Sequence, residues 1–70
     1  MKWKVDYKKI KVLRQRYGFS QQDIAEIIGT TQAMVSLIEQ GKRNITIDKL
    51  LDLVEFFGVE LEYFIIKKEE

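Results

Sequence analysis

Seventy residues are enough for one domain with a small hydrophobic core. The absence of cysteine excludes a disulfide framework and a thiolate zinc site, and the absence of histidine removes the usual general base and the commonest metal ligand. We therefore expect a protein that is not an enzyme and needs no cofactor. The apolar runs are too short to span a bilayer, so a cytoplasmic location without membrane contact is expected.

The charges are unevenly distributed along the sequence. Residues 1–20 carry seven Lys or Arg against one Asp, whereas residues 45–70 carry seven Asp or Glu against three Lys. A basic end suits a polyanionic partner, although a solvated helix surface explains the same charges equally well. The charge pattern alone therefore leaves both interpretations open.

Apolar periodicity and capping residues predict four helices, over residues 7–17, 21–28, 32–40 and 47–57. Each follows a residue whose side chain can cap a helix N-terminus, namely Asp6, Ser20, Thr31 and Thr46. Ser20 and Asp23 also have the spacing of a capping box. A glycine follows each predicted helix, where a left-handed residue is favourable, at positions 18, 29, 41 and 58. We therefore predict an all-α fold of four to five helices.

Apolar residues at helical spacing define the core that we expect between these helices. Each helix contributes one stripe. The stripes are formed by Ile10, Leu13 and Tyr17, by Ile24, Ile27 and Ile28, by Val35 and Ile38, and by Leu50, Leu51, Val54 and Phe57.

After Gly58 the apolar pattern changes to a period of two. Apolar or aromatic residues at every second position predict a strand over residues 59–66, with one face formed by Val59, Leu61, Tyr63 and Ile65. A fifth short helix is the competing interpretation, but Glu60 is a poor cap for it. We divide the chain accordingly into a helical domain over residues 1–58 and a terminal strand with a charged tail over residues 59–70.

No second strand is expected elsewhere in the sequence. A lone strand leaves its backbone N–H and C=O groups unpaired, so we expect the strand to pair with its copy in a two-fold-related chain. This interpretation predicts a homodimer whose dimerisation residues are Val59, Leu61, Tyr63 and Ile65.

Only Gly29, Thr30 and Thr31 separate the second and third predicted helices. A three-residue turn that opens on glycine is typical of a helix-turn-helix. Ala25 is small at the position where the third helix crosses the second. The wedge between the two helices would be filled by Ile24, Ile28, Val35 and Ile38.

Through these residues the chain resembles the phage-repressor helix-turn-helix family, of the Cro and lambda-repressor type, over about residues 10–59. The resemblance rests on Leu13-Arg14 and on residues 18–25, 29–32, 38–43 and 57–59. It implies a five-helix fold that places the third helix in the major groove of double-stranded DNA. It also implies a transcriptional regulator that works as a dimer, and a two-fold dimer predicts an inverted-repeat operator.

The resemblance implies that the third helix contacts DNA bases. Gln32, the first residue of that helix, is expected to read a base because its amide can bond adenine N6 and N7 together. Ala33 and Ser36 are short enough to let the helix approach. Met34 and Leu37 lie on the same helix and are included in the predicted DNA-binding set.

Other residues match family positions around the third helix. Gln21 matches a position at the start of the second helix that meets phosphate. Arg14 and Glu39 match a structural pair that joins the first and third helices. Phosphate contacts are expected from the residues after the third helix, although the two cations could instead oppose its C-terminal dipole: Lys42, Arg43 and Asn44.

The sequence departs from the family pattern at Met34 and Leu37, where the family has polar residues. Apolar side chains there could contact thymine methyl groups or a partner protein. The C-terminal ending is also similar to that of HipB-type antitoxins, which add a strand after the fourth helix and pair it across a dimer. The alternative function is therefore an antitoxin that binds a toxin protein and its own operator.

Overall fold

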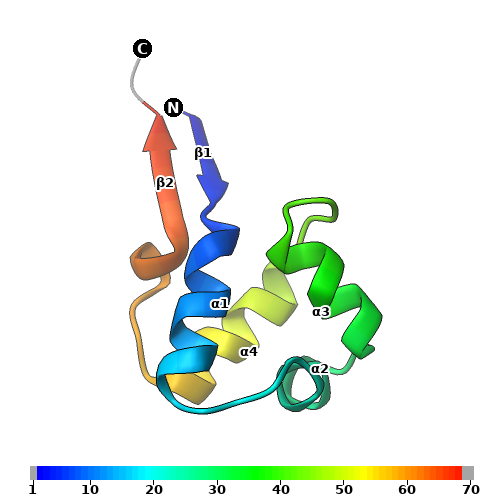
Figure 1. Cartoon of the computed structure of the whole chain (residues 1–70). Helices are drawn as coiled ribbons and strands as arrows, with labels where there is room; N and C mark the ends of the chain where they lie inside the picture. The colour runs from blue at the N-terminus through cyan, green and yellow to red at the C-terminus, as the bar shows by residue number, and fades with distance from the viewer. Residues whose placement is uncertain (1, 69–70) are drawn as a thin grey trace.

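The structure is a computed structural model that describes residues 2–68. Four helices form its body, namely α1 (Tyr7–Arg16), α2 (Gln21–Ile28), α3 (Gln32–Glu39) and α4 (Ile47–Phe57) (Figure 1). Two strands, β1 (Lys2–Val5) and β2 (Ile65–Lys68), flank this body in sequence, and a short 3₁₀ helix, η1 (Leu61–Phe64), precedes β2. The predicted helices are confirmed, with a difference of one residue at the C-terminal ends of α1 and α3. Within the described residues, no helix is long and apolar enough to cross a membrane.

The N-terminal caps differ between the helices. The Ser20 hydroxyl accepts the Asp23 N–H at 3.0 Å, and the Asp23 carboxylate accepts the Ser20 N–H at 2.9 Å, which completes the predicted capping box. The Thr31 hydroxyl accepts the Met34 N–H at 3.2 Å. Asp6 and Thr46 occupy the predicted N-cap positions of α1 and α4, but neither makes a side-chain cap hydrogen bond. Side-chain caps therefore stabilise α2 and α3 only.

The hydrophobic core lies where the four helices meet. Its buried members come from every helix and from η1: Ile10, Leu13, Ile24, Ala25, Ile28, Val35, Ile38, Leu50, Leu53 and Phe64. Two residues predicted in the core stripes are exposed instead. Tyr17 is 58% exposed and stacks on Phe57 at the surface, and Leu51 is 46% exposed because α4 turns Leu53 inward in its place.

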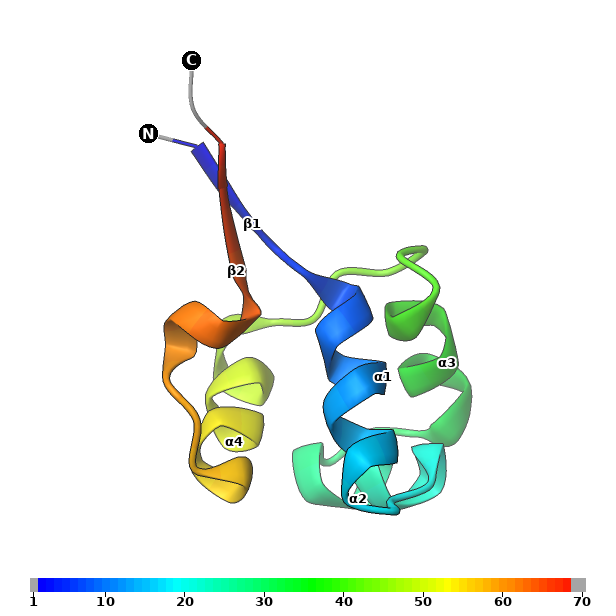
Figure 2. The ribbon, with the colours of Figure 1, turned by 60° about the vertical axis from the view of Figure 1, so that its left-hand side comes forward.

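The C-terminal strand exists, but its bounds and its pairing partner differ from the prediction. Residues 61–64 form η1, and the strand is confined to residues 65–68. β2 pairs antiparallel with β1 of the same chain, with Val5 opposite Ile65 and Trp3 opposite Lys67. Figures 1 and 2 show this two-stranded ribbon projecting from the helical body. The pairing across a dimer was predicted because β1 had not been recognised as a strand.

Packing of Phe64 explains why the alternating pattern failed over residues 59–64. Phe64 is completely buried, and its carbonyl accepts the Asp6 N–H at 2.7 Å, so the chain must turn to bring it under α1. The proposed dimerisation residues are consequently half-buried within their own chain, where they pack against the core: Val59, Leu61, Tyr63 and Ile65. Their part in dimerisation stays a prediction.

Candidate nucleic-acid interface

The turn between α2 and α3 fixes how the two helices cross. Gly29 has a φ of +72°, and the Thr30 N–H donates to the Ala25 carbonyl at 2.8 Å, which closes α2 with a left-handed glycine. Ala25 is fully buried at the crossing, so a larger side chain would separate the helices. Thr31 then caps α3 within two residues of the glycine. The short turn and its two caps therefore fix the start of α3 relative to α2.

Arg14 of α1 braces the other end of α3. Its Nε and Nη2 donate to the two oxygens of Glu39, at 2.7 Å and 2.9 Å, and its Nη1 donates to the Phe19 carbonyl at 3.1 Å. Arg14 and Glu39 are both buried. A bidentate pair in which the third guanidinium nitrogen also donates a hydrogen bond is the geometry in which a buried ion pair is best compensated. The predicted structural role of this pair therefore has the geometry that a brace requires.

The ionisation of Glu39 follows from its surroundings. Burial raises the pKa of the Glu39 carboxyl, but hydrogen bonds from Arg14 and Gln21 and the positive charge of Arg14 outweigh burial, so the pKa lies below its usual value. The hydrogen bonds to Glu39 likewise raise the pKa of the Arg14 guanidinium. Both groups are therefore charged around neutral pH.

Two glutamines extend this brace to the start of α3. The Gln21 amide nitrogen donates to Glu39 at 3.0 Å, and the Gln21 amide oxygen accepts from the Gln32 amide nitrogen at 3.2 Å. A continuous path of side-chain hydrogen bonds thus runs from Arg14 through Glu39 and Gln21 to Gln32. The sequence placed these residues individually but did not reveal that Gln21 joins the brace to Gln32.

The hydrogen bond to Gln21 orients the Gln32 side chain and leaves part of its amide free to form other hydrogen bonds. Gln32 is exposed, and its amide keeps one N–H donor and its carbonyl oxygen after bonding Gln21. One donor and one acceptor side by side are what the N7 and N6 edge of adenine requires in the major groove. Gln21 both donates to Glu39 and accepts from Gln32, so one side-chain N–H remains for the predicted phosphate contact.

The other side chains on the DNA-facing side predicted for α3 are small or half-buried. Ala33 is exposed, whereas Ser36 and Leu37 are half-buried. Met34 is half-buried and packs against the core. The Gln40 amide donates to the Ser36 hydroxyl at 2.9 Å, which places a second exposed amide at the C-terminal end of this helix. Gln40 was not among the predicted site residues, although its position four residues after Ser36 is a spacing that brings helical side chains together.

The loop after α3 is held in place by Gly41. This residue has a φ of +76°, and a Cβ added to it would lie 2.6 Å from the ring of Tyr7. Only glycine fits both the backbone conformation and the contact. Tyr7 at the start of α1 therefore packs directly on the turn that precedes three exposed residues: Lys42, Arg43 and Asn44.

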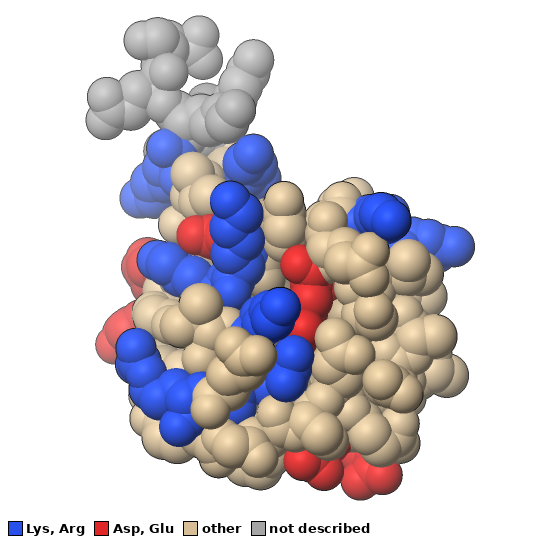
Figure 3. All heavy atoms as spheres, viewed as in Figure 1, with Lys and Arg blue, Asp and Glu red and all other residues tan. Residues whose placement is uncertain are grey.

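Cations flank α3 on two sides. Figure 3 shows Lys and Arg over α1 and over the loop after α3. The exposed lysines of β1 and α1 include Lys4, Lys8 and Lys11. α3 itself has one charged residue, Glu39, which is buried against Arg14. An uncharged helix face that can form hydrogen bonds is thus bordered by positive charge.

Related sequences agree with this geometry. The family profile described as helix-turn-helix matches residues 10–64. The HTH-type transcriptional regulator PuuR of Escherichia coli is 35% identical over 63 residues, which cover 90% of this chain and 34% of PuuR. The chain thus spans about a third of that relative. The HTH-type transcriptional regulator YgzD of Bacillus subtilis is 32% identical over 62 residues, which cover 89% of this chain and 94% of YgzD.

Two solved structures have a similar fold. The restriction-modification controller protein C.AhdI from Aeromonas hydrophila superposes with a TM-score of 0.72 at 27% identity, over 83% of this chain and 89% of that protein. The P22 c2 repressor, solved in complex with a synthetic operator, has the same fold with a TM-score of 0.75 at 17% identity, over 86% of this chain and 91% of the repressor chain. The profile match and the relatives show that the chain belongs to the helix-turn-helix family, and the P22 c2 repressor shares its fold.

Proposed function

We propose that this chain is a sequence-specific DNA-binding transcriptional regulator that acts as a homodimer on an inverted-repeat operator. The observation that carries the proposal is the orientation of Gln32. Its exposed amide is held by Gln21, which is in turn held by the buried Arg14–Glu39 pair. A reading side chain that is oriented before binding loses less conformational freedom when it meets a base.

Phosphate contacts would set the register of α3 in the groove. The exposed cations Lys42 and Arg43 lie in the loop after α3, and Tyr7 packs on the turn that leads to them. Contacts of this kind position a protein on DNA without reading sequence. They supply affinity that depends strongly on salt.

A single copy offers one reading helix to the DNA. α3 has eight residues, and only its first turns can reach base edges in the docking that this family uses. Two copies related by a two-fold axis would place their α3 helices in successive major grooves, about 34–36 Å apart, and would read an inverted repeat. The homodimer is therefore part of the proposal.

The alternative function, an antitoxin that binds a toxin protein, receives less support. It rested on apolar side chains at Met34 and Leu37, on the acidic C-terminal third, and on a C-terminal strand expected to pair across a dimer, whereas β2 pairs with β1 of its own chain. Met34 packs against the core of its own chain, and Leu37 is half-buried. No observation on α3 favours a protein partner over DNA.

The test begins with selection of bound duplexes from a random pool, which should return an inverted repeat. Gln32→Ala should then relax the preference at one base position in each half-site, by about 1–3 kcal/mol of discrimination. Gln22→Ala is the matched control, because Gln22 is an exposed glutamine on α2 that bonds only Glu26. An unchanged selected sequence for Gln32→Ala would refute the assignment of α3 as the reading helix.

A second measurement separates phosphate contact from base contact. Arg43→Ala should weaken binding to the selected site and to unrelated duplex by similar factors. It should also lower the slope of log affinity against log salt by about one unit. A loss confined to the selected site would instead make Arg43 a base-reading residue.

A further inference from the structure

The two-stranded ribbon has an apolar face that continues beyond the helical body. Cross-strand partners share a face, so Val5 and Ile65 lie on the same side as Trp3 and Lys67. Val5 and Ile65 pack against the core. Trp3, one pair further out, is 57% exposed. A two-stranded ribbon is marginally stable without a covered face, so this outer part calls for a packing partner.

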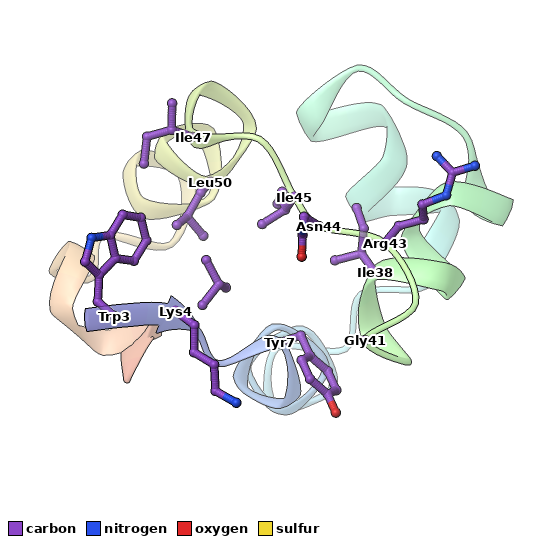
Figure 4. A pocket seen from close by; sticks show the side chains of 11 residues that line it. Trp3, Lys4, Tyr7, Ile38, Gly41, Arg43, Asn44, Ile45, Ile47 and Leu50 are labelled. Atoms are coloured by element: carbon purple, nitrogen blue, oxygen red, sulfur yellow. The ribbon is translucent and has the colours of Figure 1, made fainter. Parts of the chain in front are cut away.

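Trp3 lines two hollows. The larger, of about 490 Å³, lies between β1 and the segment that joins α3 to α4, and Leu50 and Ile38 line it. The smaller, of about 270 Å³, is lined by Leu61 and Ile65. Both hollows share two walls, Trp3 and Ile47. Figure 4 shows these two side chains close together at one end of the larger hollow.

We propose that this surface is where a second copy of the chain docks, with Trp3 of each copy seated in the larger hollow of the other. We call it the ribbon patch and define it by Trp3, Ile47, Leu61 and Ile65. The inference rests on the proposed homodimer and assigns the interface that the sequence had placed on a strand pairing across the dimer. A two-fold interface must be complementary to itself. The ribbon patch meets that requirement because it combines a protruding indole with an adjacent hollow.

The chemistry of the patch also suits a second copy. Ile47 is 55% exposed beside Trp3, so the centre of the patch is apolar. Its rim carries both signs of charge, with Glu62 and Lys67 at the smaller hollow and Lys4 at the larger one. In a two-fold arrangement Glu62 of one copy can face a lysine of the other. Large aromatic side chains in the centre of such patches dominate association energies.

The position of the ribbon patch agrees with the proposed reading of an inverted repeat. Arg43 and Asn44 line one side of the larger hollow, so a partner seated there lies next to the loop that follows α3. Gln32 lies at the opposite end of α3. A two-fold axis at this surface therefore brings the two loops together and keeps the two Gln32 ends apart.

Trp3 is the only tryptophan of the chain, so its fluorescence reports on the ribbon patch alone. On dilution of the wild-type protein, the emission maximum should move to longer wavelength as Trp3 becomes exposed. Sedimentation velocity on the same samples should show dissociation from dimer to monomer with the same midpoint. An emission maximum that stays constant while the sedimenting mass changes would overturn the proposal.

Point substitutions complete the test. They are preferable to deleting the C-terminal segment, because a truncation before Phe64 would remove part of the core. Ile47→Glu should raise the midpoint concentration by about thirtyfold or more. Val12→Glu is the matched control, since Val12 is an exposed β-branched residue at 47% exposure on α1 and lines neither hollow. Circular dichroism should show both variants folded. Equal midpoints for the two variants would place the interface elsewhere.

The failures can be told apart. A stable dimer that is insensitive to Ile47→Glu and to the environment of Trp3 would refute the ribbon patch and leave the proposed homodimer intact. A protein that stays monomeric at every concentration, with or without the selected duplex, would refute the homodimer and the ribbon patch together. Neither result would contradict base reading by Gln32, which can be measured on a duplex that contains a single half-site.

Discussion

The α2–α3 unit and the terminal segments of this chain are held in different ways. α2 and α3 have side-chain caps at their starts, a glycine closing α2, and the path of hydrogen bonds from Arg14 to Gln32. The terminal segments rely on backbone pairing between β1 and β2 and on one deeply buried side chain, Phe64. Specific polar contacts fix the first region, whereas the second leaves the apolar surface around Trp3 open.

This difference matches what each region would do. Base reading requires side chains fixed to within fractions of an ångström, and buried polar networks with satisfied partners provide that fixation. Association between two copies requires apolar area that is exposed in the monomer. In the proposed dimer, the well-determined α2–α3 unit reads DNA and the open ribbon patch holds two such units together.

The largest effect should come from breaking the attachment of the terminal segments to the helices. Phe64→Ala should lower the free energy of unfolding by about 3–5 kcal/mol, because it leaves a cavity under α1. Chemical denaturation followed by circular dichroism measures this. Phe56→Ala serves for comparison, because Phe56 is 48% exposed and should cost clearly less. Equal losses would mean that η1 contributes little to the core.

The next effect tests the brace of the α2–α3 unit. Arg14→Ala should lower the free energy of unfolding by about 3 kcal/mol, because it leaves the Glu39 carboxylate buried without its main partner. In a double-mutant cycle, Glu39→Ala should cost much less once Arg14 is absent. Unfolding energies that simply add in the double variant would show that the two side chains act independently.

The brace also predicts how stability depends on pH. The folded-state pKa of Glu39 lies below its ordinary value of 4.5, so its contribution is complete above pH 4.5 and is lost as the pH falls through the folded-state pKa. Between the folded-state pKa and pH 4.5, the Glu39 carboxyl binds a proton more readily in the unfolded state than in the folded state, so stability decreases as the pH falls. Glu39→Gln should therefore flatten the fall in stability below pH 4.5. If the free energy of unfolding falls as steeply below pH 4.5 in Glu39→Gln as in the wild type, Glu39 gains no stabilisation from Arg14 on folding.

The sequence predicted the α2–α3 unit well because its signals are local. The capping box at Ser20, the cap at Thr31 and the glycine after α2 lie within twelve residues and act on their neighbours. The pair of Arg14 and Glu39 could be named because the family resemblance supplied it. The hydrogen bond between Gln21 and Gln32 could not, because it depends on the angle at which α2 and α3 cross.

The terminal segments could be predicted only in part, since they are determined by contacts between distant residues. Lys2–Val5 alternates lysine with apolar residues, which is a strand pattern, but four residues are too few to identify a strand without its partner. Its partner lies about sixty residues away in the sequence. The alternation predicted for residues 59–66 leaves Phe64 off the face of Val59, Leu61, Tyr63 and Ile65, whereas the chain turns at this segment and buries Phe64.

The smallest expected effect is the difference between two N-caps, Ser20 in the α2–α3 unit and Thr46 at the start of α4. Ser20→Ala should lower the free energy of unfolding by about 1 kcal/mol, because it removes the hydroxyl that accepts the Asp23 N–H and so breaks the capping box of α2. Thr46→Ala should cost less, because the Thr46 side chain makes no cap hydrogen bond at the start of α4. Thermal unfolding of the two variants under one condition measures the difference. If Thr46→Ala costs as much as Ser20→Ala, side-chain capping does not distinguish the α2–α3 unit from the rest of the chain, and its rigidity must come from the Arg14–Glu39 brace alone.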